Sequence, residues 1–304
     1  PGRFDKVLAI NKCWLQDDLG NEIRNFVYHF CIEHNFTFYD LREHTGLMRN
    51  LMIRNTRKGD WMVNVIFAKD EPDNRELLLN AISQKFNPHA LNYCINEKLN
   101  DSTFDQTFIS YKGNFEIQEE LNGLKFNISP KSFFQTNPVQ AEKLYEVALN
   151  FAEISKNDVV YDLYCGTGTI TCLAASRAKK AIGVEIIEEA IQAAKINASI
   201  NNITNVEFLV GDMKDVFNPQ FYASHGSPDI IITDPPRSGM HPKVVEYLSE
   251  IKCPKIVYVS CNPATQARDL ALLDSTYKVI KSQAVDMFPQ THHVENVVLL
   301  ELRS

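Results

Sequence analysis

The second half of the chain alternates short apolar runs with segments of helical spacing, and this alternation restricts the fold most strongly. It starts with Pro138–Ile154, an amphipathic segment with proline near its first turn and apolar residues along one side. Strands that alternate with helices build a parallel sheet covered by helices on both faces. The pattern therefore predicts an α/β fold with a doubly wound, seven-stranded sheet. The expected strands are Val159–Leu163, Ala181–Glu185, Val206–Val210, Ile230–Thr233, Ile256–Val259, Val279–Val285 and Val294–Leu302.

Residues 1–128 follow a different pattern and predict a smaller α+β domain ahead of the doubly wound domain at 129–304. Two apolar runs, Leu51–Asn55 and Trp61–Phe67, are joined by a turn that contains glycine, which is typical of a β-hairpin. Helical spacing follows at Asn74–Phe86. Further short strands are expected at Ala90–Ile95, Thr107–Tyr111, Phe115–Glu119 and Leu124–Ile128.

Basic residues cluster around the predicted hairpin. They are Arg49, Arg54, Arg57 and Lys58. Charges on a sheet edge discourage aggregation, whereas the same charges on a binding face contact nucleic-acid phosphates. The formal net charge of −7 opposes a nucleic-acid partner, but net charge does not report where the charges lie. Both interpretations of the cluster stay open at this stage.

Composition narrows the class of protein. Hydrophobic residues make up 44% of the chain and charged residues 23%, as in soluble globular proteins. The sequence has neither an apolar run of about 18 residues nor a basic-then-apolar leader, so we expect a cytoplasmic protein without a membrane partner. Its seven cysteines are scattered without a C-x-x-C pair, which argues against a disulfide framework or a metal site. Because the chain starts at Pro1 without an initiator methionine, we expect a fragment of a longer protein.

Acidic residues mark the ends of three successive predicted strands, and glycines follow the first of them. The acids are Asp162, Glu185 and Asp212, and the turn after the first strand holds Tyr164, Gly166 and Gly168. This turn is neither a dinucleotide fingerprint nor a phosphate loop. The three acids suit an ammonium group, a ribose diol and an adenine amino group, so the predicted cofactor is the cationic nucleoside S-adenosylmethionine. Each glycine or acid alone is more often turn chemistry or a helix N-cap than a ligand contact.

Two more strand ends carry residues of chemical interest. Asp234 starts a loop stiffened by Pro235 and Pro236, which suits a site that holds a planar ring beside a methyl donor. A plain proline turn is the alternative. Cys261 follows the strand Ile256–Val259 within the run Ser-Cys-Asn-Pro. A free cysteine is usually inert core filling, and the alternative is a nucleophile at the mouth of a strand.

Together these motifs resemble the RNA uracil-5-methyltransferases, the family that makes 5-methyluridine in transfer and ribosomal RNA. The five motifs follow in the family's order and are Ser132–Asn137, Asp162–Thr169, Asp234–Arg237, Ser260–Pro263 and His293–Val297. The resemblance covers residues 129–304 firmly and the first half loosely. It implies a Rossmann-like, S-adenosylmethionine-dependent methyltransferase domain with an RNA partner. We also expect a monomer.

The resemblance assigns the chemistry to two residues. Cys261 would add to carbon 6 of uracil, because carbon 5 is a poor nucleophile until an enolate forms. Glu295 would then remove the proton on carbon 5, so that the thiolate leaves. His292 and His293 are alternative bases on chemical grounds.

The resemblance also implies contacts to the cofactor and the RNA. Gln135 contacts the cofactor or the flipped base, and Asp234 lies between cofactor and uracil. Either one of the two residues Phe133 and Phe134 touches the ligand, or both pack in the core. The expected cofactor contacts are Gln135, Asp162, Tyr164, Gly166, Gly168, Glu185, Asp212 and Asp234, and the expected RNA contacts are Lys131, Phe134, Arg237 and the hairpin's Arg54 and Arg57.

The chain departs from the family in two respects. Members usually begin with a small RNA-binding barrel, and this chain has nothing ahead of Pro1. Some ribosomal-RNA enzymes hold an iron–sulfur cluster on four cysteines, and Cys13 resembles only the last of these ligands, so we expect no cluster in this fragment. On Cys13 alone we prefer ribosomal over transfer RNA as the substrate.

Two other functions are alternatives. A cytosine-5-methyltransferase also uses a cysteine adduct, but it needs a contact to the exocyclic amine, and the His-Val-Glu motif argues against it. A non-catalytic RNA-binding or assembly factor could retain the same fold.

Overall fold

The computed structural model describes residues 9–303, and its internal contacts divide the chain into two units. Within this range the first unit holds residues 9–119 and 128–131, and the second holds 120–127 and 132–303. The chain crosses between them in a two-stranded sheet formed by β5 (Ile117–Leu121) and β6 (Leu124–Ile128). The predicted boundary between residues 128 and 129 lies at the end of this hairpin.

The first unit is a four-stranded sheet with two helices packed on one face. The strands are β1 (Met48–Asn55), β2 (Trp61–Phe67), β3 (Ala90–Ile95) and β4 (Phe108–Gly113), in that order in the sheet. β1 and β2 form the predicted antiparallel hairpin, whereas β2 and β3 are parallel because helix α2 (Pro72–Phe86) crosses between them. Both helices bury apolar side chains against β1, β2 and β3.

Helix α1 (Asp18–Glu33) belongs to this unit and is not among the predicted elements. Asp17 caps its first turn, where the carboxylate accepts a hydrogen bond from the backbone N–H of Leu19 at 3.0 Å. Ile23, Val27 and Cys31 recur at every fourth residue and are buried. The cap and this spacing are the sequence signals that identify the helix.

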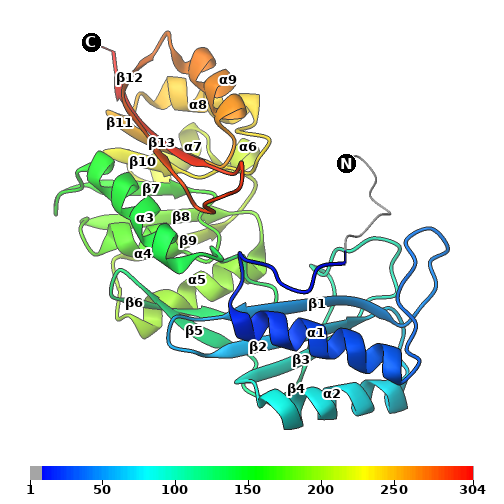
Figure 1. Cartoon of the computed structure of the whole chain (residues 1–304). Helices are drawn as coiled ribbons and strands as arrows, with labels where there is room; N and C mark the ends of the chain where they lie inside the picture. Colours follow the sequence, from blue (N-terminus) through cyan, green and yellow to red (C-terminus); the bar gives the residue numbers. More distant parts are fainter. Residues whose placement is uncertain (1–8, 304) are drawn as a thin grey trace. The chain divides into compact units, whose positions relative to one another are not determined.

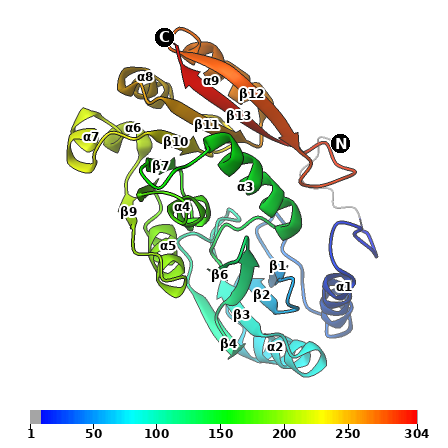
Figure 2. The same ribbon diagram turned by 90° about the vertical axis from the view of Figure 1, so that its left-hand side faces the viewer.

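In the second unit, a seven-stranded sheet confirms the predicted doubly wound fold (Figure 1, Figure 2). The strand order is β12-β13-β11-β10-β7-β8-β9. Strands β7 to β11 are parallel, and β13 and β12 complete one edge in the antiparallel sense. The strands are β7 (Val159–Leu163), β8 (Lys180–Glu185), β9 (Val206–Val210), β10 (Ile230–Thr233), β11 (Lys255–Ser260), β12 (Tyr277–Val285) and β13 (Glu295–Leu302).

Helices cover both faces of this sheet and bury two separate hydrophobic clusters. On one face lie α3 (Pro138–Ala152), α4 (Thr169–Ala175) and α5 (Glu188–Ile200). On the other lie α6 (Met213–Val216), α7 (Pro219–His225), α8 (Pro242–Ile251) and α9 (Pro263–Leu273). The short helices α6 and α7 are not among the predicted elements.

The topology brings the residues named at the predicted strand ends to one edge of the sheet. The chain runs from β7 to β8 and β9 on one side of β7, then returns to β10 and β11 on the other side. A parallel sheet binds ligands at this reversal, beyond the carboxyl ends of its strands. β13 runs in the opposite direction, so its first residue, Glu295, lies at the same edge.

Candidate active site

Cys261 and Glu295 come together at the end of the ladder between β11 and β13. The last pair in that ladder is Ser260 with Asn296, so the next residues on the two strands, Cys261 and Glu295, stand opposite each other. Both side chains are half-buried. The fold thus places the predicted nucleophile beside the predicted base.

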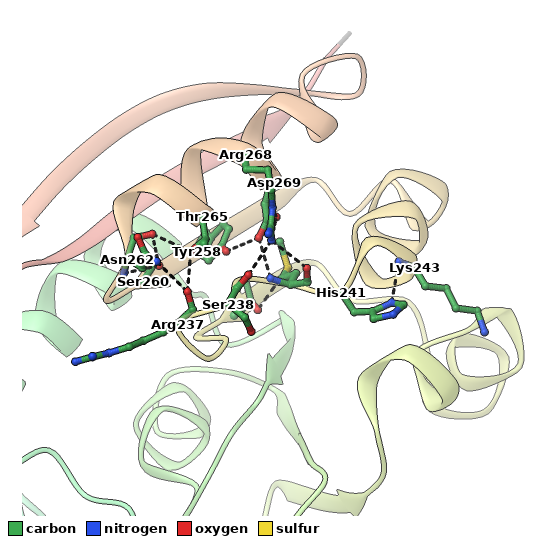
Figure 3. Close-up of polar contacts among 12 residues, drawn as sticks. Arg237, Ser238, His241, Lys243, Tyr258, Ser260, Asn262, Thr265, Arg268 and Asp269 are labelled. Atoms are coloured by element: carbon green, nitrogen blue, oxygen red, sulfur yellow. Dashed lines mark hydrogen bonds and ion pairs between the residues drawn. The ribbon is translucent and has the colours of Figure 1, made fainter. Parts of the chain in front are cut away.

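The loop that follows β10 is fastened to the start of α9 through its backbone (Figure 3). Nδ2 of Asn262 and Oγ1 of Thr265 both donate to the carbonyl oxygen of Arg237, at 3.0 and 3.1 Å. Arg268 donates to the carbonyl oxygen of Ser238 at 2.9 Å. In Figure 3 the side chain of Arg237 extends away from this network, and the residue is exposed. The backbone is therefore held, and the Arg237 side chain takes no part in this network.

The buried carboxylate of Asp269 completes this attachment. Its Oδ2 accepts hydrogen bonds from the Tyr258 hydroxyl at 2.7 Å and from the backbone N–H of Met240 at 2.8 Å, and its Oδ1 accepts two from the Arg268 guanidinium. Four donors to one buried carboxylate make a strong anchor. Sequence reasoning missed Asp269, because an Arg–Asp pair on a helix resembles an ordinary surface pair.

Burial and neighbouring charges shift the pKa of three titratable groups at this edge. Burial raises the pKa of the Cys261 thiol, and the charge of Glu295 raises it further, while a hydrogen bond from Arg237 opposes both. Burial raises the pKa of Glu295 to about 6, against the opposing charge of Arg237. Burial, then the charges of Glu295 and Asp162, raise the pKa of Asp234 well above its usual range. The groups therefore interact electrostatically.

Asp162 is fully buried and offers an unused acceptor. Its Oδ2 accepts a hydrogen bond from Oγ1 of Thr171 at 2.6 Å, but its Oδ1 is buried without a hydrogen-bond partner among residues 9–303. Burial raises the pKa of this carboxyl to about 7, although the Thr171 bonds oppose the shift. A buried acceptor without a donor is costly. Asp162 therefore fits a ligand that carries a positively charged donor, such as an ammonium group.

The glycines of the turn after β7 serve two different purposes. Gly166 has φ +53°, and an added Cβ would meet no atom within 4 Å, so open space lies in front of it. Gly168 has φ +79°, and its Cβ would come within 2.8 Å of the Ala194 side chain, so close packing requires glycine there. Glu185 accepts a hydrogen bond from the backbone N–H of Gly166 at 3.2 Å. Gly166 and Glu185 thus border the open space, whereas Gly168 lets the turn pack closely against Ala194.

Tyr164 and Asp212 lie near each other at the same edge. Tyr164 is half-buried with φ +67°, and its pKa is raised by burial and then by the charge of Asp212. Asp212 caps α6 and accepts hydrogen bonds from the backbone N–H and Nζ of Lys214, at 3.2 and 2.7 Å. Both readings of Asp212, helix cap and cofactor contact, are compatible with this position.

The two phenylalanines in the segment ahead of α3 differ in how far they are buried. Phe134 is half-buried and packs on the core, with its ring 6.3 Å from that of Phe126, whereas Phe133 is 74% exposed. Gln135 is half-buried. Tyr145 of α3 is buried, and the charges of Asp234, Asp162 and Glu295 add to the effect of burial in raising its pKa. Tyr145 is thus a buried residue of the site as well.

The predicted basic contacts in the first unit all have partners there. Nζ of Lys131 donates to the carbonyl oxygen of Phe104 at 2.7 Å, and Arg54 donates to that of Pro130 at 3.5 Å. Arg57 binds the buried carboxylate of Glu119. Arg49 needs a correction, because its guanidinium is 1% exposed and holds the carbonyl oxygens of Asn96, Lys98 and Asn100. It is neither a solvated edge charge nor a free phosphate contact.

Residues 9–303 contain neither a metal-binding cluster nor a membrane-spanning helix. Across residues 9–303, no three His, Cys, Asp or Glu side chains are grouped so as to hold a metal ion. Cys13 is half-buried, and its backbone N–H and carbonyl are both hydrogen-bonded to the Asn21 side chain. The helices of this same range include none with the length and apolarity needed to span a bilayer.

Comparison with known proteins identifies relatives along the whole chain. The family model described as tRNA (Uracil-5-)-methyltransferase matches residues 44–216 and 222–303. An uncharacterized RNA methyltransferase of Bacteroides thetaiotaomicron is 53% identical over all of this chain and 68% of its own length. Another from Porphyromonas gingivalis is 50% identical over 99% of this chain and 66% of its own length. The chain therefore spans about two thirds of the length of these relatives.

A solved structure agrees with the family match. The crystal structure of Pyrococcus abyssi tRNA (uracil-54, C5)-methyltransferase in complex with S-adenosyl-L-homocysteine superposes with a TM-score of 0.81 and 31% identity. The match covers 98% of this chain and 71% of that one. The chain therefore belongs to the tRNA (uracil-5-)-methyltransferase family, a family of RNA methyltransferases.

Proposed function

We propose that this protein methylates carbon 5 of a uridine in RNA, with S-adenosylmethionine as methyl donor and a covalent Cys261 adduct as intermediate. The observation that carries the proposal is the antiparallel register that sets Cys261 opposite Glu295 at the ligand-binding edge of the sheet. The family match and the relative solved with S-adenosyl-L-homocysteine support the same reaction. A uracil within structured RNA must first be turned out of its stack, at a cost of a few kcal/mol.

Cys261 starts the reaction by adding its sulfur to carbon 6 of the flipped uracil. The electron pair of the ring double bond then moves through carbon 5 toward the oxygen on carbon 4, which makes carbon 5 nucleophilic. Bound S-adenosylmethionine supplies the methyl group, which carbon 5 takes as the donor sulfur keeps the electron pair of the broken bond. Arg237 lowers the pKa of Cys261 through a hydrogen bond and its charge, so it favours the reactive thiolate against burial.

Glu295 ends the reaction by taking the proton from carbon 5. The electrons of that bond re-form the double bond between carbons 5 and 6, and the thiolate of Cys261 leaves. Burial raises the pKa of Glu295 to about 6, which makes it a stronger base than an exposed carboxylate and still leaves most of it ionised at neutral pH. Glu295 rather than His292 or His293 takes this role, since both histidines are exposed.

The buried acceptor of Asp162 would hold the amino group of the methyl donor, and Glu185 and Gly166 would border its ribose. Asp162→Asn removes the negative charge, so we expect the affinity for S-adenosylhomocysteine to fall by about 10- to 100-fold, as when a charged hydrogen bond is lost. Because the pKa of Asp162 is raised to about 7 and a bound cation favours the ionised form, wild-type affinity should rise as pH increases through that value. Calorimetric titration measures both effects.

Asp274→Asn is the matched control for this titration. Asp274 is an exposed carboxylate beyond the end of α9, paired with Arg303. Its loss should leave the affinity unchanged. Equal affinities for Asp162→Asn and the wild type would show that the buried acceptor does not bind the donor.

The reaction is tested by incubating the protein with S-adenosylmethionine labelled in its methyl group and with transcripts of transfer and ribosomal RNA. We expect labelled 5-methyluridine after digestion to nucleosides. Labelled 5-methylcytidine would favour the cytosine-directed alternative, and RNA binding without any methylation would favour the non-catalytic one. The two transcripts also test our preference for ribosomal RNA, which rests on Cys13 alone. RNA contacts by Lys131, Phe134, Arg237, Arg54 and Arg57, and a cytoplasmic, monomeric state, stay predictions.

A further inference from the structure

A buried carboxamide connects the two strands that carry Cys261 and Glu295. Gln266 lies on α9 and is 1% exposed. Its Nε2 donates to the carbonyl oxygen of Tyr258 in β11 at 2.9 Å and to that of Asn296 in β13 at 3.2 Å. Its Oε1 accepts a hydrogen bond from Nδ2 of Asn296 at 2.7 Å. One side chain therefore binds both strands and the residue next to Glu295.

The partners determine how this amide is oriented. The carbonyl oxygens of Tyr258 and Asn296 can only accept, so the NH₂ group of Gln266 must face them. The remaining oxygen of Gln266 then meets the NH₂ group of Asn296, whose own oxygen accepts a hydrogen bond from the Ser282 hydroxyl at 3.1 Å. The chain of bonds runs from β12 through β13 to α9 and β11. Reversing either amide would bring like groups together.

The hydrogen bonds of Gln266 form a clamp at the end of the β11–β13 ladder, while on its other side β13 still pairs with β12, where Val285 lies opposite Glu295. Ser260 and Asn296 are the last pair of the β11–β13 ladder. Beyond them Cys261 turns into α9, and Glu295 joins β13 to the preceding loop. Ends of ladders open more easily than their centres. The contacts of Gln266 tie α9 to β13 at this point and limit how far the two reactive residues can separate.

We infer that Gln266, together with Asn296, is a positioning residue pair that sets the distance of the Glu295 base from the uracil ring held on Cys261. The inference rests on the proposed function. Addition of the Cys261 thiolate fixes the ring to the turn between β11 and α9, whereas proton removal needs Glu295 of β13 to reach carbon 5 of that same ring. Loss of the clamp should therefore slow the release of the methylated product much more than it slows adduct formation.

Gln266→Met tests this, because methionine nearly preserves the volume of glutamine and removes all three hydrogen bonds. Adduct formation is followed in a single turnover with transfer and ribosomal RNA transcripts that contain 5-fluorouridine. Adduct resolution is followed with ordinary transcripts. We expect resolution to slow by about 100-fold, as for a displacement of about 1 Å in a reacting group, so that methylated adduct accumulates on ordinary RNA. Formation should change far less.

Two further variants keep the result interpretable. Asn296→Leu, at a half-buried position, removes the amide–amide bond and leaves the two Gln266 bonds to backbone carbonyls, so it should slow resolution less and carries the test if Gln266→Met does not fold. The double variant should be no slower than Gln266→Met alone, since that change already removes every bond between the two amides. Leu273→Ala, at the buried far end of α9, should lower the melting temperature without changing the ratio of the two rates.

The outcomes distinguish failure of the positioning role of Gln266 from failure of the proposed function. Equal slowing of both steps in the folded amide variants, or no slowing of either, would overturn the positioning role. Absence of any adduct between wild-type protein and 5-fluorouridine RNA would instead overturn the proposed function, and the role of the clamp with it.

Discussion

Cys261→Ala should abolish both 5-methyluridine formation and every covalent complex with RNA, while S-adenosylhomocysteine still binds. Without the sulfur no enolate forms, and carbon 5 does not attack the methyl donor. The expected loss of methylation is on the order of 10⁴- to 10⁶-fold, the range found when a covalent nucleophile is removed from an enzyme. Labelled-methyl transfer and denaturing gels of protein with 5-fluorouridine RNA measure the two losses.

Cys253→Ala provides the matched control. Cys253 lies before β11, is 1% exposed, and has its pKa raised to about 12 by burial, so its thiol stays protonated and inert. Its replacement should lower stability but leave the adduct intact. A covalent complex that survives Cys261→Ala would assign the chemistry to another residue.

Glu295→Gln should have the opposite signature, because it blocks the last step rather than the first. The uracil would be attacked and methylated, but the proton on carbon 5 would stay, and the thiolate could not leave. We expect methylated adduct to accumulate on ordinary RNA, with turnover reduced by about 10²- to 10⁴-fold, the usual contribution of a general base. Mass spectrometry of the protein–RNA complex should find one added methyl group.

The rates of adduct formation and resolution in the wild-type protein should depend on pH in a way that supports the same roles for Cys261 and Glu295. Resolution requires ionised Glu295, whose pKa is raised to about 6, so its rate should fall about tenfold per unit below that value and level off above it. Formation requires the thiolate of Cys261, whose pKa is also raised, so its rate should keep rising through neutral pH. A Glu295→Gln adduct that resolves at the wild-type rate would exclude Glu295 as the base.

Hydrophobic periodicity predicted the fold of the second unit, because the spacing of apolar residues within each segment indicates a helix or a strand. The short runs from Val159 to Leu302 and the helices between them lie where the alternation places them. Helix α1 has a cap at Asp17 and buried residues at helical spacing, yet its mixed polar sequence masks that signal. Helices α6 and α7 are shorter still, and tertiary packing of Phe217 and Phe221 supports them more than propensity does.

The candidate site was partly predictable for a related reason. Motifs at strand ends identify Asp162, Asp234 and Cys261, since strand ends meet at one edge of a parallel sheet. Gln266 and Asp269 carry no such signal, because only the fold reveals that these polar helix residues are buried and bonded to β11. Long-range polar contacts of this kind depend on register and packing rather than on local sequence.

The covalent mechanism is tested most directly by the complex with RNA that contains 5-fluorouridine, in the presence of S-adenosylmethionine. Fluorine on carbon 5 cannot be removed as a proton is, so the methylated adduct should be trapped. The account predicts a complex that survives denaturation, carries one added methyl group and links to the RNA through a peptide containing Cys261. Absence of that complex, from protein shown to bind both RNA and S-adenosylhomocysteine, would contradict it.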